Sequence, residues 1–334
     1  MMRASRDVVS TDAPSCQNRT TDFGLVVGID HYPHFRPLHG AIADARNFHA
    51  WMCDGDGGDV EPQHVRLILS TPEPPAPIHS QIDAAFGDLI AAADTLGGGR
   101  RLYFYFSGHG ATCVGGPGDD VALLLATWSR RFARLALSSK AYKGELATLG
   151  LFDEIVIFLD CCRSITERAV GLPPTMTPSL TVAPLPTRQF VGYATEVGQS
   201  AFETRDGQPW QGVFTRHLIS ILRRSKCGIA ANNLKDTLER EIATAGQQAH
   251  VVNELREGSM FGWCGTPPQL EISFIRASGR VRLRNGALDV IAEHDVSSGP
   301  WQLSLEAGLY KLEGDGRKPF VFQHGQEGVT HVEF

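Results

Sequence analysis

Two apolar β runs that end abruptly in reactive residues constrain the fold of this chain most strongly. Residues 101–107 are followed by Gly108-His109-Gly110, and residues 154–159 lead into Asp160-Cys161-Cys162. Runs that are apolar on both faces are typical of strands in parallel sheets that helices cover. If the two runs are neighbours in such a sheet, their carboxyl ends coincide, and an imidazole and a thiol meet in one crevice.

Strand-like and helix-like segments alternate along the first three quarters of the chain. Apolar runs predict strands at 23–29, 65–69, 101–107, 154–159, 190–194 and, at an edge, 259–263. Helical spacing of apolar residues predicts helices at 39–52, 78–96, 138–150, 213–223 and 234–245. This alternation predicts an α/β fold with a mostly parallel six-stranded sheet and helices on both faces. Prolines at 165–188 predict a flexible linker there.

The pattern of apolar and polar residues changes after residue 265. Short runs follow without a helical pattern, at 270–275, 280–284, 288–292, 301–305, 309–312, 320–322 and 330–334. They predict a small antiparallel β-sandwich. We therefore expect a flexible tail at 1–22, an α/β domain at 23–265 and an accessory β-sandwich at 266–334.

Composition excludes several classes of function. The net charge is −6 and no run of Lys and Arg offers a track for phosphates, so nucleic acid is not an expected partner. No apolar stretch has the length of a membrane span, and the N-terminus lacks the apolar core of a signal peptide. The seven cysteines form neither a disulfide framework nor a paired zinc motif. We expect a cytoplasmic protein without a metal or cofactor.

A cysteine and a histidine at matching strand ends are the pair that cysteine-nucleophile catalysis requires. The thiolate attacks, and the imidazole takes the proton of the thiol or stabilises the thiolate. Glycines on both sides of His109 leave room for a substrate carbonyl, and the N–H groups of Gly110 and Cys162 are the predicted oxyanion donors. No Asp or Asn is evidently placed to orient the imidazole, so the pattern predicts a dyad.

The adjacent cysteines differ in the direction that they are expected to point. Alternate residues of a strand share a face, so Cys162 lies on the side of Asp160 and Cys161 on the other. If Asp160 opens into the crevice, Cys162 is the nucleophile and Cys161 packs beneath it. The structural alternative is that the cysteine is an apolar filler and that Gly-His-Gly is a turn.

These residues resemble the motifs of the caspase-like cysteine proteases, especially the prokaryotic members. Phe-Ser-Gly-His109-Gly is similar to the histidine motif of the family, and Asp160-Cys-Cys162-Arg-Ser is similar to its nucleophile motif. The caspase signature places the histidine about 50 residues before the cysteine, and here the separation is 53. Segments 25–45, 198–203 and 212–215 extend the resemblance over about residues 23–265. It implies an endopeptidase that acts through a thioester acyl-enzyme.

Two acidic residues point to the specificity that the resemblance implies. Asp160 stands two residues before the nucleophile, as in metacaspases and paracaspases, where caspases have Gln. Asp44 lies where those relatives carry a second acidic residue of the S1 pocket. Two carboxylates pair with Arg or Lys, so we expect cleavage of proteins or peptides after a basic residue. The alternative is that Asp44 is a surface helix residue and that Asp160 merely ends a strand.

Other interpretations stay open. The chain could be a non-catalytic or partner-activated interaction module whose β-sandwich binds a partner protein, or a related cysteine protease that a partner regulates. Asp54, Asp56 and Asp59 lack the regular spacing of a calcium loop, although calcium activation occurs among metacaspases. The basic run 128–134 and the linker residues Arg168 and Arg188 offer sites for self-processing.

Overall fold

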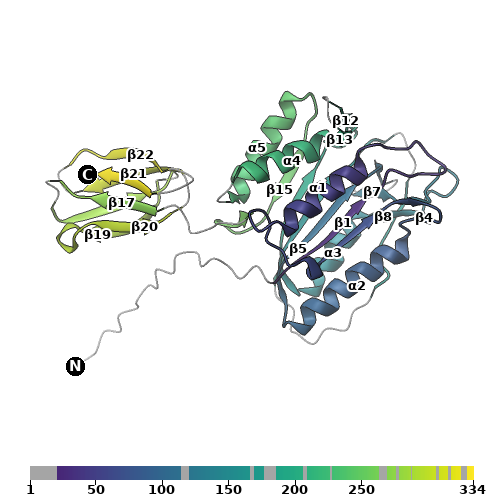
Figure 1. Ribbon diagram of the computed structural model, residues 1–334, viewed down its shortest axis with the longest axis horizontal. Helices are drawn as coiled ribbons and strands as arrows, with labels where there is room; N and C mark the ends of the chain where they lie inside the picture. The colour runs from purple at the N-terminus through teal and green to yellow at the C-terminus, as the bar shows by residue number, and fades with distance from the viewer. Residues whose placement is uncertain are drawn as a thin grey trace. The chain divides into compact units, whose positions relative to one another are not determined.

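The fold is given by a computed structural model that divides into two compact units (Figure 1). The larger unit comprises the described residues of 21–224 and 228–262, and the smaller unit centres on those from 269 onward. The structure describes residues 21–113, 120–165, 169–176, 186–205, 209–225, 228–262, 269–275, 278–286, 288–305, 308–314, 317–324 and 329–334.

The centre of the larger unit is a six-stranded sheet in the order β15-β11-β9-β5-β1-β2. Its strands are β1 (Asp22–Gly28), β2 (Val65–Leu69), β5 (Gly99–Ser107), β9 (Phe152–Asp160), β11 (Arg188–Tyr193) and β15 (His250–Asn253). All neighbours pair in parallel except β15, which runs antiparallel to β11 at the edge. The predicted mostly parallel sheet is confirmed.

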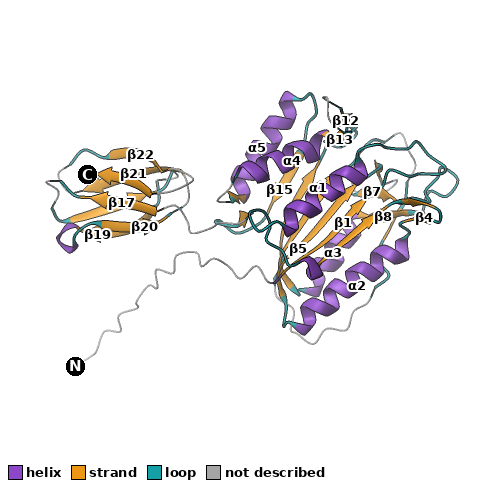
Figure 2. Cartoon of the chain, in the orientation of Figure 1, coloured by secondary structure: helices purple, strands orange, loops and turns teal. Residues whose placement is uncertain are grey.

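Helices cover both faces of this sheet, as predicted (Figure 2). They are α1 (Ala41–Cys53), α2 (His79–Thr95), α3 (Ser139–Leu149), α4 (Val213–Arg224) and α5 (Ala231–Thr244). Helices α2 and α3 share a core with Phe104 of β5, whereas α1, α4 and α5 share a core with Tyr105. Adjacent residues of a strand point to opposite faces, so β5 supplies both cores and is continuously apolar over residues 102–106. Among the described helices, none is both long and apolar enough to cross a membrane.

The register of β5 and β9 aligns their carboxyl ends. Ser107 pairs with Asp160, and Gly28 at the end of β1 pairs with Ser107 from the other side. His109 and Cys162 therefore each stand two residues beyond a paired strand end. This is the edge at which open parallel sheets bind ligands.

A second, four-stranded sheet follows His109 and is not predicted from the sequence. Its order is β10-β8-β7-β6, with β6 (Gly110–Thr112), β7 (Val121–Leu124), β8 (Ala136–Ser138) and β10 (Gly171–Leu172). Strand β10 belongs to the segment that the sequence predicts to be a linker, and its pairing with β8 makes that prediction wrong here. Residues 166–168 and 177–185 lie outside the described residues. Strands of two to four residues are too short for periodicity to reveal.

The edge strand of the main sheet differs from the prediction. Strand β15 takes the edge position, whereas β16 (Met260–Phe261), within the predicted 259–263, pairs with β14 (Ile229–Ala230) outside the main sheet. Strand β15 has only four residues with polar ends, so its sequence carries little signal.

The remaining short elements of the larger unit connect the main ones. They are η2 (Pro62–His64), β3 (Thr71–Pro72), β4 (Pro75–Ala76), β12 (Glu203–Thr204) and β13 (Gln211–Gly212). Strands β12 and β13 pair with each other just before α4. Both contribute residues to the wall of the cavity at the carboxyl edge of the main sheet.

The smaller unit is all-β, as predicted. Its strands are β17 (Gln269–Ser273), β18 (Arg280–Arg284), β19 (Val290–Asp295), β20 (Trp301–Ser304), β21 (Gly308–Gly314), β22 (Phe320–His324) and β23 (Val329–Glu333). Sheets β20-β17-β23 and β19-β18-β21-β22 enclose a core that contains Leu270, Leu283 and Leu312. Two details differ from the predicted antiparallel sandwich: β17 and β23 pair in parallel, and the 3-10 turn η3 (Val296–Ser298) follows β19.

Candidate active site

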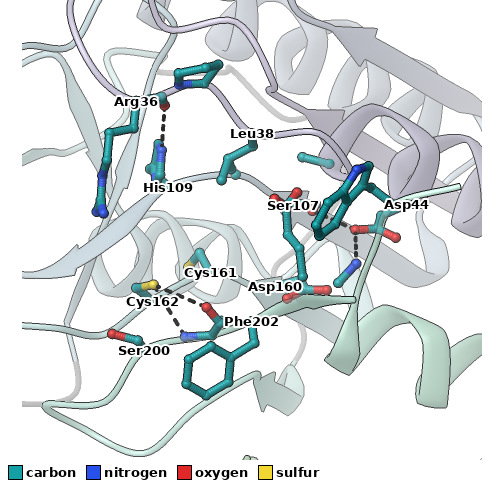
Figure 3. Close-up of a pocket in the computed structure, with 17 residues that line it drawn as sticks. Arg36, Leu38, Asp44, Ser107, His109, Asp160, Cys161, Cys162, Ser200 and Phe202 are labelled. Carbon is teal, nitrogen blue, oxygen red and sulfur yellow. Dashed lines mark hydrogen bonds between the residues drawn. The ribbon is translucent and has the colours of Figure 1, made fainter. Parts of the chain in front are cut away.

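The two reactive strand ends line one cavity of about 460 Å³ at the carboxyl edge of the main sheet (Figure 3). His109 and Cys162 share its wall with Asp44 and Asp160. The structure therefore brings together the predicted dyad and the two predicted acidic residues, which are far apart in sequence. All lining residues belong to the larger unit.

The imidazole of His109 is held by the segment that follows β1. Its Nε2 lies 2.8 Å from the carbonyl oxygen of Arg36, and its ring packs against those of Tyr32 and Phe35 at centroid distances of 4.7 and 4.8 Å. The backbone N–H of His109 donates to the Tyr32 hydroxyl at 2.9 Å. His109 is buried, so these contacts fix the plane of the ring.

The hydrogen bond to the Arg36 carbonyl oxygen determines the tautomer of His109. A carbonyl oxygen only accepts hydrogen bonds, so Nε2 carries the proton and Nδ1 carries the lone pair in the neutral ring. The sequence predicts a dyad because no acidic or amide side chain is evidently placed to orient the ring. The structure supplies that orienting group from the backbone, where no residue type signals it.

The Cys162 thiol contacts the backbone of the segment before β12. Its Sγ accepts the N–H of Ala201 at 3.3 Å and lies 3.8 Å from the carbonyl oxygen of the same residue. Burial raises the pKa of the thiol, and the hydrogen bonds from Ala201 and Ser200 offset this only in part. The thiol is therefore protonated at neutral pH in this arrangement.

The neighbouring Cys161 has a different environment. It is 3% exposed and packs in the core that includes α2 and α3. Burial raises the pKa of its thiol well above the ordinary value. A buried thiol of this kind is a poor nucleophile, which agrees with the predicted choice of Cys162.

The glycines beside His109 are required by packing. A Cβ on Gly110 would lie 2.6 Å from both the Cys161 Sγ and the Cys162 carbonyl oxygen, and one on Gly108 would lie 2.7 Å from the Tyr32 hydroxyl. The backbone of Gly110 therefore runs directly against the nucleophile segment. The sequence assigns these glycines to the approach of a substrate, whereas the contacts show that the protein itself already fills the space.

Asp44 projects from the first turn of α1 and is 1% exposed, so the alternative of a surface helix residue is wrong. Its Oδ2 accepts the N–H of Gly212 at 2.8 Å and the hydroxyl of Ser107 at 3.3 Å. Its Oδ1 is buried and has no hydrogen-bond partner among the described residues. A buried oxygen without a donor is unfavourable, so a donor brought by a ligand would stabilise this site.

Asp160 ends β9 and is held by the start of α4. Its Oδ2 accepts hydrogen bonds from the Thr215 hydroxyl at 2.6 Å and from the Thr215 backbone N–H at 3.0 Å. The Thr215 hydroxyl is in turn 2.5 Å from the hydroxyl of Tyr105. A Cβ on Gly212 would collide with the Asp160 carboxylate, so only glycine fits opposite it.

The acidic end of the cavity carries raised pKa values. Burial raises the pKa of Asp160 to about 6. Burial, and then the charge of Asp160, raise the pKa of Asp44 well above its ordinary value. Two buried carboxylates this close cannot both ionise easily without a cation. Both shifts favour a proton shared by the pair when no cation is close.

Two further residues support the site, and the sequence analysis assigns a role to neither of them. Glu203 lines the cavity, and its Oε1 accepts the backbone N–H groups of His39 and Gly40 at 3.0 and 2.6 Å, at the start of α1. Gln247 is 2% exposed and bridges the N–H of Phe202 to the carbonyl oxygen of Ala194. Their hydrogen-bond partners are distant in sequence, so no local motif reveals these contacts.

The loop with Asp54, Asp56 and Asp59 is a turn at the end of α1. The Oδ1 of Asp54 accepts the N–H of Asp56 at 3.1 Å, and its carbonyl oxygen accepts the N–H of Asp59 at 2.9 Å. Within the part of the chain that the structure describes, no three His, Cys, Asp or Glu side chains gather as they would around a metal ion.

Comparisons with known proteins find similarity over most of the larger unit. A family model described as the caspase domain of the C14 peptidases matches residues 21–255. A probable protease from a Desulfuromonadales bacterium is 29% identical over 213 residues, which are 60% of this chain and 26% of that protein. The chain thus spans about a quarter of the length of that relative. The crystal structure of caspase-1 from Spodoptera frugiperda aligns with 76% of this chain and 96% of its own, at 12% identity and a TM-score of 0.48.

The class is an α/β protein whose parallel sheet has a histidine and a cysteine just beyond two adjoining strand ends. The match of the family model covers more than half of the sequence. The chain therefore belongs to the caspase-domain family of C14 peptidases.

Proposed function

We propose that the protein is a cysteine endopeptidase that cleaves peptide bonds after Arg or Lys. Cys162 is the nucleophile and His109 is the general base and acid. The N–H groups of Gly110 and Cys162 form the oxyanion hole, and Asp44 and Asp160 bind the basic side chain. The observation that carries the proposal is that one cavity joins the histidine and the cysteine to two buried carboxylates.

The chemistry follows from the tautomer of His109. Nδ1 takes the proton of the Cys162 thiol as the sulfur attacks the scissile carbonyl carbon, and two backbone N–H groups stabilise the oxyanion. The imidazolium then protonates the leaving amine, and a thioester remains. Water, deprotonated by His109, hydrolyses the thioester and restores the thiol. The Arg36 carbonyl keeps the ring in place because it accepts the Nε2 proton throughout.

The resting thiol must be released before it attacks. Its hydrogen bonds are to Ala201, and burial raises its pKa, so a preformed thiolate is not the ground state. Entry of a substrate next to the segment 200–203 would displace this contact. The thiol would then transfer its proton to His109 only when a carbonyl is in place, which would limit wasteful reactions of the sulfur.

The acidic pocket explains the choice of substrate. The Asp44 Oδ1 lacks a hydrogen-bond donor among the described residues, and a guanidinium or ammonium group would supply one and place a positive charge between the two carboxyl groups. An acidic side chain would add a further charge to the three carboxylates of Asp44, Asp160 and Glu203 that line the cavity. Cleavage after Asp, the caspase preference, is therefore disfavoured by electrostatic repulsion.

The direct test is turnover of fluorogenic peptides that end in Arg, Lys or Asp, with and without calcium. We expect hydrolysis after Arg and Lys only. Cys162→Ala and His109→Ala should abolish it, because loss of a nucleophile or base costs at least about 10³-fold in rate. Cys161→Ala is the matched control, since it removes the adjacent thiol, and it should keep turnover.

The alternative is an interaction module that does not cleave peptides. Absence of turnover with every basic substrate, with or without calcium, would favour it over the peptidase. Turnover that survives Cys162→Ala but not Cys161→Ala would contradict the assignment of the nucleophile.

A further inference from the structure

The cavity is charged differently at its two ends. Asp44 and Asp160 lie at one end, Arg36 lies beside His109 at the other, and Cys162 lies on the wall (Figure 3). Arg36 is the single Lys or Arg among the described lining residues. The proposed S1 pocket uses only the acidic end. The basic end has no part in binding the residue before the scissile bond.

The direction of a bound peptide follows from the proton transfers. The basic side chain enters the acidic pocket, and its carbonyl carbon meets the Cys162 sulfur. The leaving amine receives its proton from His109, so the residue after the scissile bond must lie on the histidine side. A substrate therefore runs from the carboxylates, past the sulfur, toward Arg36.

An aromatic ring flanked by guanidinium groups lies beyond His109 on this side. Phe35 packs edge-on against the His109 ring. The Arg36 guanidinium carbon lies 5.3 Å from the centroid of the Phe35 ring, and that of Arg130 lies 6.0 Å from it. Arg130 belongs to the basic run 128–134, so two distant segments bring positive charge to one place. Arg36 and Arg130 are both exposed.

We propose that Arg36, supported by Arg130, selects an acidic residue at the first or second position after the scissile bond. The preferred substrate is then a basic residue followed closely by Asp or Glu. This inference rests on the proposed function and deepens it, because it adds a second specificity element to the same cavity. Among the described residues, no ion pair of the Arg36 side chain competes with a substrate carboxylate.

The test compares internally quenched peptides, amidated at the C-terminus, that share one sequence up to Arg. They differ only after the scissile bond, where they carry Asp, Ala or Lys in the first or in the second position. The readout is the ratio of kcat/KM for Asp over Lys within each variant. A general loss of activity cancels in this ratio, whereas a change in charge recognition does not. Amidation excludes recognition of a terminal carboxylate.

We expect the ratio to be about five to ten in the native protein. Asp in the substrate is attracted to the exposed Arg36, whereas Lys in the same position is repelled by a similar free energy. Arg36→Glu should invert the ratio, and Arg130→Glu should lower it. Arg223→Glu, an equal charge change at the exposed end of α4, should leave it unchanged. Raising the salt concentration to roughly 0.5 M should bring the native ratio toward one.

A ratio near one in the native protein, or one that Arg36→Glu and Arg130→Glu leave unchanged, would overturn the inference. A substrate with Arg followed by a fluorogenic amine has no residue after the scissile bond. If this substrate is hydrolysed while the peptide ratio stays near one, the proposed peptidase stands and only the inference fails. If no Arg substrate is cleaved, both fail.

Discussion

Two carboxylates dominate the behaviour of the site at the scale of single residues. Asp44 and Asp160 are both buried and line the cavity, and each accepts structural hydrogen bonds through its Oδ2. The raised pKa of both groups means that the empty site holds a proton that a bound cation must displace. Binding of a basic side chain is therefore coupled to pH.

This coupling predicts proton release when an Arg peptide binds. At pH 7 the Cys162→Ala variant should release about one proton per peptide, because a guanidinium favours ionisation of both acids. Calorimetry in buffers of different ionisation enthalpy measures this number. For the native protein, kcat/KM for Arg substrates should fall as the pH is lowered through about 6, the pKa of Asp160. A binding enthalpy that does not depend on the buffer would contradict the shared proton.

The same pair predicts that the site is a source of instability. A carboxyl group whose pKa is higher in the folded protein than in the unfolded chain contributes stability that is lost as the pH rises through that window, here from about 4 upward. Asp44→Asn removes one of the two charges and should raise the free energy of unfolding at pH 7.5 by about 0.5–2 kcal/mol. Activity should be lost at the same time.

Thermal unfolding at pH 7.5 and pH 4 measures the effect of Asp44→Asn. The gain should be largest at pH 7.5 and should shrink at pH 4, because Asp44 stays protonated in the folded chain there and an unfolded Asp, with a pKa of about 3.9, is only partly ionised. Asp88→Asn, at an exposed position of α2, is the control and should change the stability little at either pH. Equal destabilisation by Asp44→Asn at both values of pH would refute the repulsion between the carboxylates.

At the scale of elements, one buried amide holds the segment that touches the nucleophile. Gln247 follows α5 and bridges Phe202 to Ala194 through hydrogen bonds of 2.9 and 2.8 Å. Ala201, beside Phe202, donates to the Cys162 sulfur. The position of the thiol therefore depends on a glutamine from a distant connection.

Gln247→Ala should lower stability and change the reactivity of Cys162. It leaves an N–H and a carbonyl group unpaired, which costs about 1–3 kcal/mol. A loosened 200–203 segment should expose the thiol, so alkylation of Cys162 by iodoacetamide should become faster while hydrolysis of Arg peptides becomes slower. Gln248→Ala is the matched control, because its side chain is exposed and accepts a hydrogen bond from Gln199, away from Phe202 and Ala194 in sequence. Identical effects of the two variants on alkylation would show that Gln247 has no positioning role.

The sequence predicts elements well where burial requires a continuous apolar run. The central residues of β5 and β9 are covered on both faces, so these stretches are continuously apolar and easy to recognise. Strand β15 is short and ends in polar residues, so its place at the sheet edge depends on tertiary contacts with β11 rather than on pattern. Strand β10 is hidden for the same reason, because two residues carry no period.

The sequence predicts those parts of the candidate site whose chemistry depends on side chains, but not those that depend on backbone groups. Cys162, His109, Asp44 and Asp160 are visible as reactive residue types at strand ends and in a helix, and the cavity brings them together. The carbonyl of Arg36 cannot be foreseen, because every residue has one and only the path of the chain places it. The Ala201 amide escapes prediction for the same reason.

At the scale of the whole molecule, the site depends on the larger unit alone. Every residue that lines the cavity lies between Arg36 and Gly212, and the β-sandwich has a separate core. Each unit therefore buries its own apolar residues, as independent domains do. Arg188, a predicted site of self-processing, begins β11 and pairs with Glu154, while Arg168 lies outside the described residues.

A chain that ends at residue 265 should therefore keep its kcat/KM for small Arg peptides within about twofold of the full chain. The midpoint of thermal unfolding, followed by circular dichroism, should also stay close to that of the α/β unit in the full chain. Loss of activity in a truncated chain that is still folded would show that the β-sandwich contributes to catalysis.

The unsatisfied Asp44 oxygen has a consequence for the free protein. Two acidic groups buried side by side destabilise the free protein. A positively charged ligand should offset this repulsion and raise the free energy of unfolding. Small guanidines that cannot be cut should therefore make the protein harder to melt. The pocket therefore favours cations because the repulsion between its carboxyl groups is relieved when a cation binds, and the bound state is the more stable one.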